Sequence, residues 1–455
     1  MSRIGLCVIA RNEERFLSDC LKSVRGVADE IVVVDTGSTD RTRSIATMSG
    51  ARVVDFAWVD DFSAARNAGL AALQSTHVLV LDADERLIDA ENALQSAARD
   101  PRFTIGLLAL HDANALDASF ADVLAGRSRL WDPCFVPRFF VNDAALRFTR
   151  RVHETLTGDP LGVSAFLKSR RSSIAALSAC IVHLGEVPQL RVERSKRERN
   201  TRLLERALDD DPSDGDLAGY LALELARSGA LGEARKIGER HLWPFLETLR
   251  GIPDDAPKHS PVRLASVLAT CLVQDGENER ALDVISASHA CCIEPHPNLV
   301  FLEGAANERL GRYGAARSAF EQCLALHANR YTIPVNPGAT SSAPRLRLAN
   351  LDLIAGDPDA ALAHIDAQSS WSGQFELPAV LTRAEAHLQR GDPNRALQAL
   401  APVLSRPEAP PDLFAIAAAA TEALGALDKS LRDTAKQFER STWLETRRLA
   451  LVSGL

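Results

Sequence analysis

Several features are missing from this 455-residue chain, and each absence removes a class of protein. Its eight cysteines form no CxxC pair, so neither a zinc site nor a redox motif is indicated. No segment approaches the roughly 18 consecutive apolar residues that a transmembrane helix needs. The formal net charge of −8 creates no basic field for nucleic acid. The sequence therefore favours a globular protein that binds neither nucleic acid nor the bilayer interior.

The cysteines are scattered along the chain, which predicts reduced thiols and a cytoplasmic location, because disulfide frameworks belong to oxidising compartments. The N-terminal stretch MSRIGLCVIARNEE lacks the long apolar run of a signal peptide, and we interpret it as a first strand. An apolar content of 46% and a charged content of 25% are ordinary for a globular chain. The length fits two or three domains.

Strand and helix signals alternate in the N-terminal part, which predicts an α/β domain with a mostly parallel sheet covered on both faces. Strands are expected over residues 3–10, 30–35, 51–55, 77–82 and 104–111, and helices over 13–27, 40–50 and 61–75. From Cys134 to Val182 the shorter pattern indicates an antiparallel extension. We assign residues 1–190 to this domain and residues 191–214 to a basic linker helix.

Residues 215–455 are predicted to form an all-α repeat region, because alanine and leucine recur there at helical spacing. Six segments align on glycines at positions 229, 276, 311, 356, 391 and 425. Three of the five steps lie close to the roughly 34 residues of a tetratricopeptide unit. Each glycine should end the first helix of a pair with positive φ. The two longer steps predict long turns around residues 241–259 and 330–343. Such an array binds a partner or dimerises the protein, while an irregular helical bundle is the alternative.

Two apolar strands end in carboxylates. The segment IVVVDTGSTDRT places Asp35 at the end of one strand, and VLVLDADE places Asp82 and Asp84 at the end of another. The carboxyl ends of parallel strands form the ligand-binding edge of such a sheet. Paired carboxylates suit a hard divalent cation, which in this position most often serves a phosphate. We therefore expect an enzyme that handles a nucleotide diphosphate; ordinary turns with helix caps are the alternative.

The segments VIARNEERFLSDCLKSV, EIVVVDTGSTDRT, DFSAARNAGL and VLVLDADE resemble inverting family 2 glycosyltransferases of the GT-A fold. The resemblance is strong over residues 3–90 and continues to residue 185. The following RVERSKRERNTRLLERAL and the repeats resemble bacterial glycosyltransferases with a tetratricopeptide tail, a group similar to those that glycosylate cysteine or serine of bacteriocin peptides. The resemblance implies a hexosyltransferase that uses a UDP-sugar donor and Mn²⁺ or Mg²⁺.

The resemblance also implies roles for individual residues. Glu154 would be the catalytic base, and a salt bridge with Arg150 or Arg151 is its alternative. Asp84 and His183 would bind the metal, and an imidazole ligand favours Mn²⁺. The nucleotide-sugar contacts would be Asn12, Glu13, Asp35, Arg66 and Asp82. Three further cations are candidates for the diphosphate: Arg138, Lys196 and Arg199. For the last two, a solvated linker helix is the alternative.

The acceptor remains open between a peptide, a protein and a cell-surface glycan, and the repeats could also form a homodimer. The sequence allows two rival functions. A tetratricopeptide scaffold with a degenerate enzyme domain is disfavoured because all the expected site residues are present together. A nucleotidyltransferase is disfavoured because ARNEERF offers no glycine for a phosphate loop. The acidic, alanine-rich segment 112–130 is hypothesised to be a mobile lid.

Overall fold

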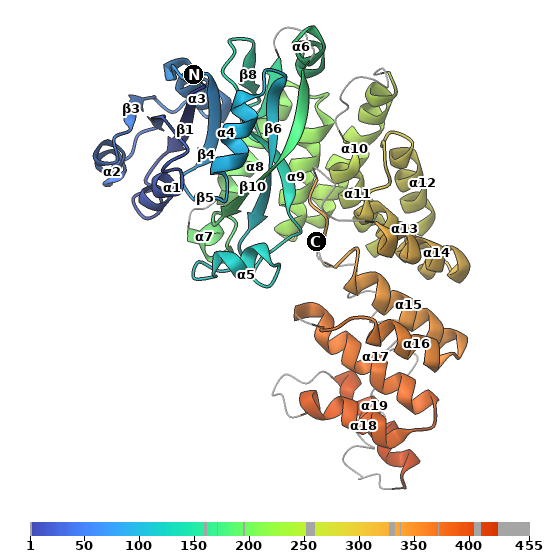
Figure 1. The fold of residues 1–455 in the computed structure, drawn as a ribbon. Coiled ribbons are helices and arrows are strands. Elements are labelled where there is room, and N and C mark those ends of the chain that lie inside the picture. The colour runs from blue at the N-terminus through green and yellow to red at the C-terminus, as the bar shows by residue number, and fades with distance from the viewer. Residues whose placement is uncertain are drawn as a thin grey trace. The chain divides into compact units, whose positions relative to one another are not determined.

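The computed structural model describes residues 2–158, 162–170, 172–193, 196–251, 260–326, 333–336, 338–371, 373–404 and 411–425. It divides into two compact units. The first comprises Met1–Leu264 and Asn329–Pro334, and the second comprises Ala265–Ala328 and Val335–Leu455. The first unit contains the sheet and the helices that follow it, and the second contains paired helices (Figure 1).

The first unit is built on an eight-stranded sheet with the order β3-β2-β1-β4-β7-β6-β10-β5. Its strands are β1 (Ile4–Ala10), β2 (Glu30–Asp35), β3 (Arg52–Asp55), β4 (His77–Asp82), β5 (Glu85–Ile88), β6 (Phe103–Asp112), β7 (Cys134–Val141) and β10 (Ser173–His183). A separate hairpin joins β8 (Leu146–Thr149) and β9 (Thr155–Gly158). The five strands expected in the N-terminal part all form, and the α/β class is confirmed.

The antiparallel extension expected over residues 134–182 is only partly observed. Strand β7 does pair antiparallel with β4 and β6. The long strand β10, however, runs parallel to β6, so this part of the expectation is wrong. The four-residue strand β5 was not expected either, and it pairs antiparallel with β10. Its register sets Glu85 opposite His183, and this pairing brings the DADE segment to the end of β10.

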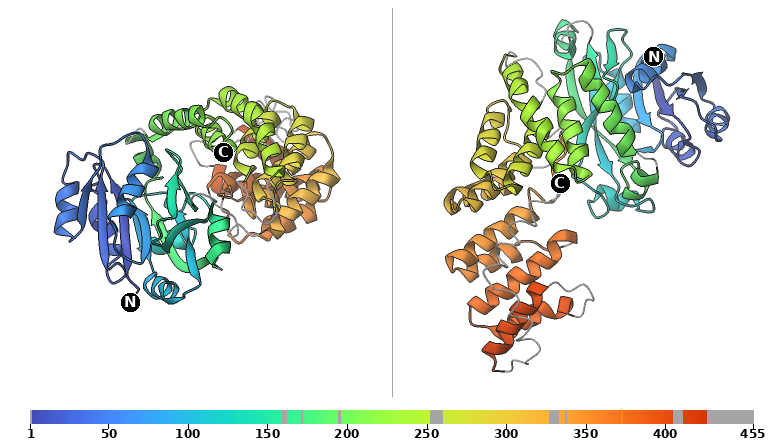
Figure 2. Two further views of the ribbon diagram at one scale, coloured as in Figure 1. Left: turned by 90° about the horizontal axis from the view of Figure 1, so that it is seen from above. Right: turned by 180° about the vertical axis from the view of Figure 1, so that it is seen from behind.

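Helices cover both faces of the sheet, as the alternation of strands and helices along the chain predicts (Figure 2). Leu6 and Val8 of β1 belong to a buried cluster with α1 (Leu17–Ser23), α2 (Thr42–Met48) and α4 (Glu91–Arg99). Cys7, between them, belongs to the cluster on the other face with α3 (Phe62–Ala72). Burying one such apolar side chain contributes about 1.5–3 kcal/mol. These two cores hold the strands, and therefore their carboxyl ends, in place.

Helices α7 (Pro188–Glu193), α8 (Lys196–Asp210), α9 (Gly215–Arg227) and α10 (Leu231–Arg250) also belong to the first unit. The compact unit therefore reaches beyond residue 190, while the domain limits 1–190, 191–214 and 215–455 stay predictions. The long turn expected over residues 241–259 is wrong for its first half, because α10 continues to Arg250; residues 252–259 lie outside the described part.

The second unit contains α11 (Val262–Gln274, which begins in the first unit), α12 (Asn278–His289), α13 (Pro297–Arg309), α14 (Tyr313–Ala325), α15 (Ser342–Ala355), α16 (Pro358–Asp366), α17 (Glu376–Gln389), α18 (Pro393–Leu404) and α19 (Pro411–Ala423), with a short 3₁₀ turn at Gly373–Phe375. The six aligned glycines all have φ between 66° and 84°, as predicted. The turn expected over 330–343 is non-helical where it is described before Ser342. Five helix pairs and the first helix of a sixth form where the repeats were predicted, and the second helix of the sixth pair lies outside the described residues.

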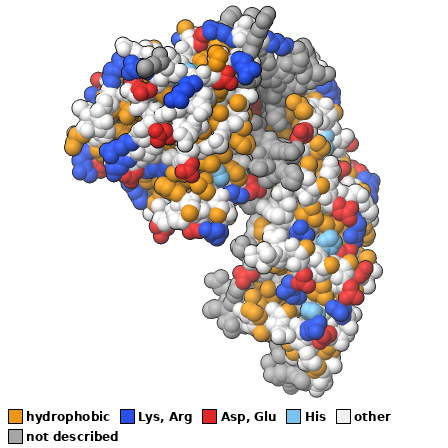
Figure 3. Space-filling model, viewed as in Figure 1, with side chains coloured by type: hydrophobic (Ala, Val, Ile, Leu, Met, Phe, Trp, Pro, Cys, Tyr) orange, Lys and Arg blue, Asp and Glu red, His pale blue; other side chains and the backbone are white. Residues whose placement is uncertain are grey.

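Surface charge and cysteine state agree with the sequence. On the face shown in Figure 3, acidic and basic side chains are interspersed, without a large area of one sign. All eight cysteines are free. Among the described helices, none combines the length and the apolarity that crossing a membrane requires.

The segment 112–130 contains the short helix α5 (Phe120–Leu124) and an isolated bridge between Ala113 and Arg129; its role as a lid stays a prediction.

Candidate active site

Asp35 and Asp82 lie at the same edge of the sheet, on either side of β1. Asp35 of β2 is in register with Ala10, and Asp82 of β4 is in register with Ile9. The loops that follow these parallel strands therefore open at one edge, as the sequence predicts. This edge carries most of the expected site residues.

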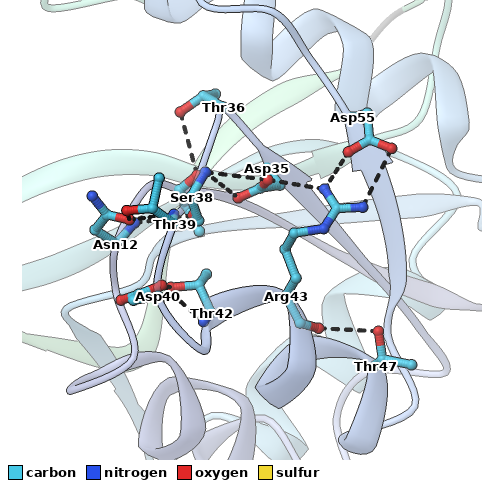
Figure 4. A network of polar contacts seen from close by, with 11 residues as sticks. Asn12, Asp35, Thr36, Ser38, Thr39, Asp40, Thr42, Arg43, Thr47 and Asp55 are labelled. Atoms are coloured by element: carbon cyan, nitrogen blue, oxygen red, sulfur yellow. Dashed lines mark hydrogen bonds and ion pairs between the residues drawn. The ribbon is translucent and has the colours of Figure 1, made fainter.

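The Asp35 carboxylate is buried, with 3% of the residue exposed, and it is held from two sides (Figure 4). It accepts a hydrogen bond from the backbone N–H of Ser38 at 3.2 Å and from Nη1 of Arg43 at 3.0 Å. Arg43 also pairs with Asp55 at the end of β3. Gly37 makes the turn possible with a φ of 102°. The carboxylate is thus oriented by the chain, and its contact with a nucleotide base stays a prediction.

Asn12 and Glu13 lie in the loop after β1, which is tied to the loop after β2. The Asn12 side-chain oxygen accepts from the N–H of Thr39 at 2.8 Å (Figure 4). The N–H of Glu13 donates to Oγ1 of Thr42 at 2.7 Å. Asn12 itself has a φ of 55°, a conformation that Asn adopts more readily than most residues. The structure therefore brings both residues next to the Asp35 loop.

Arg66 lies between two carboxylates that are far apart in the sequence. Its Nη2 donates to Oδ1 of Asp82 at 2.8 Å, and its Nε donates to Glu154. Arg66 is almost fully buried, and its Nη1 has no hydrogen-bond partner among the described residues. Burial raises the pKa of Asp82, but Arg66 and Arg138 outweigh it and hold that pKa well below its ordinary value. Asp82 is therefore ionised at neutral pH, and Arg66 holds Glu154 beside it.

Arg138 of β7 joins Asp82 to an acidic residue that sequence reasoning missed. Its Nη2 donates to Oε1 of Glu85 at 2.6 Å and to Oδ2 of Asp82 at 3.2 Å. Burial raises the pKa of Glu85 to about 7, against the opposing effect of Arg138. Glu85 is the last letter of DADE, so its place beside the acidic pair was the available signal. Arg138 thus contacts carboxylates, and a diphosphate contact stays a prediction.

Asp84 faces His183 at the end of β10. The distance from Oδ1 of Asp84 to Nε2 of His183 is 3.6 Å. On the other side of the ring, Nδ1 lies 2.7 Å from Oδ1 of Asp112, the last residue of β6. Burial lowers the pKa of His183, but the two carboxylates outweigh it and raise that pKa well above its ordinary value. Sequence reasoning missed Asp112, although it ends the apolar run LLALHD.

The surroundings of Asp84 and His183 fit a divalent cation. A carboxylate that holds one ring nitrogen of a ligating histidine is a common arrangement around metals, and Asp112 provides it. Gly185 lies so close that a Cβ there would stand 2.4 Å from Oδ2 of Asp84 and 2.5 Å from Nε2 of His183. The chain therefore keeps this space clear. In the described ranges, no group of three or more His, Cys, Asp or Glu side chains is placed to hold a metal ion.

Replacing Gly185 with alanine should therefore weaken metal binding by at least about tenfold, because the new methyl group occupies the space between Asp84 and His183. Manganese titration followed by electron paramagnetic resonance would measure the change. Gly232→Ala is the matched control, since a Cβ there meets no atom within 4 Å. Equal manganese affinity in both variants would contradict the placement of the metal.

The basic helix α8 contacts the loop that precedes α3. Arg202 and Arg206 pair with Asp60 of that loop, and Arg199 lies over the ring of Phe62 at 5.4 Å. The side chains of Arg202 and Arg206 remain more than half exposed, at 57% and 55%, so the prediction of a solvated helix still holds for them. The side chain of Lys196 lies outside the described part, and the diphosphate contacts of Lys196 and Arg199 stay predictions.

Comparisons with known proteins agree with this architecture. Residues 6–112 match the model of glycosyl transferase family 2. A TPR repeat-containing protein from Synechococcus elongatus is 33% identical over 292 residues, which cover 63% of this chain and 66% of that protein. An uncharacterized glycosyltransferase from Rickettsia bellii is 31% identical over 126 residues, which cover 26% of this chain and 42% of that protein. This chain thus spans less than two thirds of either relative. A solved tetratricopeptide repeat protein from Parabacteroides merdae, 18% identical, covers 58% of this chain and 94% of its own with a TM-score of 0.37.

Proposed function

We propose that this chain, which carries a family 2 glycosyltransferase domain at its N-terminus, transfers a sugar from a UDP-sugar to a peptide or protein side chain. The observation that carries the proposal is the pair formed by Asp84 and His183 at the carboxyl edge of the sheet. Asp112 orients the imidazole from behind, and Gly185 leaves room in front of it. The sequence match supports the family, and this geometry supports the proposal that a metal and the diphosphate bind here.

In the proposed reaction, one group of residues binds the donor and Glu154 activates the acceptor. Asp35 binds the nucleotide base, and Asp82 contacts the ribose or the donor sugar. Asp84 and His183 would hold Mn²⁺ or Mg²⁺, which when bound would supply positive charge to stabilise the departing diphosphate. Glu154 accepts the proton of the acceptor hydroxyl or thiol while its oxygen or sulfur bonds to the anomeric carbon. The bond from that carbon to the diphosphate oxygen breaks, UDP leaves with the electron pair, and the configuration inverts.

The helical repeats support a macromolecular acceptor, because stacked helix pairs present extended binding surfaces. Within the second unit, α16, α17 and α18 line a groove of about 780 Å³. The groove carries both acidic and basic side chains: Asp359, Asp366, Glu376, Arg383, Arg390 and Arg395. A mixed surface of this kind suits a polar peptide segment better than a uniformly charged polymer. A glycan acceptor is the competing outcome of the acceptor test.

Calorimetric titration tests the donor half of the proposal. UDP, UDP-glucose and UDP-N-acetylglucosamine are each titrated with and without Mn²⁺. We expect manganese-dependent binding of UDP and tighter binding of one UDP-sugar. The accepted donor is then supplied in labelled form with peptide and glycan acceptors in parallel. No binding of any UDP species would overturn the donor assignment, and label in glycans alone would overturn the peptide acceptor.

A further inference from the structure

We infer that helix α9 positions the site from outside the sheet by bracing two loops, residues 150–154 with Glu154 and residues 183–187 with His183. The inference rests on the proposed function for its meaning but on independent contacts for its geometry. All of these contacts lie within the first compact unit. Tyr220 and Glu224 of α9 are the central positioning residues.

The N-terminal end of α9 holds Arg150. Asp214 caps the helix by accepting from the N–H groups of Asp216 and Leu217, both at 3.1 Å. The Arg150 guanidinium lies 2.7 Å from Oδ2 of Asp214 and 2.9 Å from Oδ2 of Asp216. Arg150 has a φ of 76°, which non-glycine residues rarely adopt. The N-cap Asp214 and the first-turn residue Asp216 thus both hold the side chain of Arg150.

The next turn of α9 holds His153. Its imidazole stacks on the ring of Tyr220 with centroids 3.5 Å apart and an interplanar angle of 6°. The guanidinium of Arg263, in α11, lies 3.6 Å from the centroid of the same ring. Two groups this close to one ring must occupy opposite faces, so Tyr220 is enclosed between them. Arg263 also donates to Oδ1 of Asp216 at 2.9 Å, which joins this stack to the Arg150 contact.

His153 has a φ of 50°, so both ends of the short segment 150–153 are in the left-handed region. Glu154 follows directly, and its carboxylate meets Arg66, which in turn meets Asp82. A non-glycine residue keeps such a conformation only where its surroundings over-determine it. The α9 contacts therefore position the backbone that leads into Glu154, while Arg66 holds its carboxylate.

The C-terminal half of α9 holds the other loop. Glu224 accepts two hydrogen bonds from Nη2 of Arg191, at 3.1 Å and 3.0 Å. Arg191 also donates to Glu186, which follows Gly185 beside the candidate metal site. Glu224 is buried, with 6% of the residue exposed. Glu224 therefore holds Arg191, and Arg191 in turn holds Glu186 in the loop that follows His183.

The single helix α9 sets the separation of the two loops. Asp216 and Glu224 are eight residues apart, which corresponds to about 12 Å along the axis. Most of the apolar face of α9 is buried, which makes the helix a rigid support. Helix α9 therefore fixes the relative positions of the loops that carry Glu154 and His183, although it contributes neither residue.

Hydrogen exchange of the full chain tests the brace segment by segment. In Tyr220→Ala we expect amides of residues 149–158 to exchange at least about tenfold faster, while residues 183–191 keep their protection. In Glu224→Gln we expect the reverse, so each variant is the control for the other. Tyr220→Phe keeps the ring on which His153 and Arg263 lie, so the amides of residues 149–158 should keep wild-type protection. Should Tyr220→Ala fail to fold, Asp216→Asn removes the charge between Arg150 and Arg263 and carries the same expectation for 149–158.

Kinetics adds a second measurement. Tyr220→Ala should lower kcat by about 10–100-fold with little change in the KM for the donor, because the base is displaced and the nucleotide site is not. Faster exchange of both segments in both variants would overturn the brace in favour of a general loss of helix stability, as would unchanged exchange in all of them. A wild-type chain that turns over no UDP-sugar would overturn the proposed function, whereas the exchange experiment would still decide the brace.

Discussion

Replacing Asp84 with alanine is expected to lower metal-dependent transfer from a UDP-sugar by at least about 100-fold while the fold persists. Asp84 supplies the carboxylate oxygen that lies 3.6 Å from Nε2 of His183. Asp82 cannot substitute, because Arg66 and Arg138 engage both of its oxygens. Initial rates across a manganese titration would show a lower maximal rate together with a higher midpoint for the metal.

The matched control is Asp89→Asn. Asp89 is an exposed acid just beyond the far end of β5, so the same strand is altered away from His183. It has a φ of 50°, which asparagine tolerates. We expect wild-type rates for this control. Full activity in Asp84→Ala, with circular dichroism confirming the fold, would remove the metal role from Asp84.

Replacing Glu154 with glutamine is expected to lower kcat by about 10²–10⁴-fold, the usual range for loss of a general base. The amide is nearly the same size and can still accept a hydrogen bond from Arg66, so UDP affinity should stay close to that of the wild type. Single-turnover rates and calorimetric UDP titration would separate the two effects. The loss of kcat should be smaller with a thiol acceptor than with a hydroxyl acceptor, since a thiol with a pKa of about 8.5 needs less help to ionise.

Glu198→Gln is the control for this change, because Glu198 is exposed on α8 and the substitution is chemically identical. An unaltered kcat in Glu154→Gln would exclude Glu154 as the base. A loss of UDP binding that parallels the loss of kcat would instead assign the residue to the donor site. The comparison of thiol with hydroxyl acceptors also distinguishes a cysteine acceptor from a serine acceptor.

The local parts of this architecture were open to prediction because their signals are local. The apolar runs before Asp35 and Asp82 define strands, and parallel strands place their ends at one edge. Glycines such as Gly229 and Gly356 mark helix ends because few other residues adopt positive φ. The resemblance to family 2 glycosyltransferases added His183 and Glu154 to the predicted site residues. In each case a short window contains the whole signal.

The contacts that complete the site were decided by the tertiary structure alone. Arg66 joins Asp82 and Glu154, which are 16 and 88 residues away from it in the chain. Asp112 reaches His183 only because β10 lies parallel to β6 in the register that pairs them, and no periodicity reports register between strands so far apart.

The sequence by itself determined the two kinds of domain, the carboxylate edge and the helical repeat, because strand, turn and helix signals act within a few residues. Only the tertiary structure decided that Asp82 and Asp84 face different partners and that Tyr220 and Glu224 lie behind the two loops. These pairings depend on how distant elements pack, and packing energy is shared among many residues rather than written at any one position.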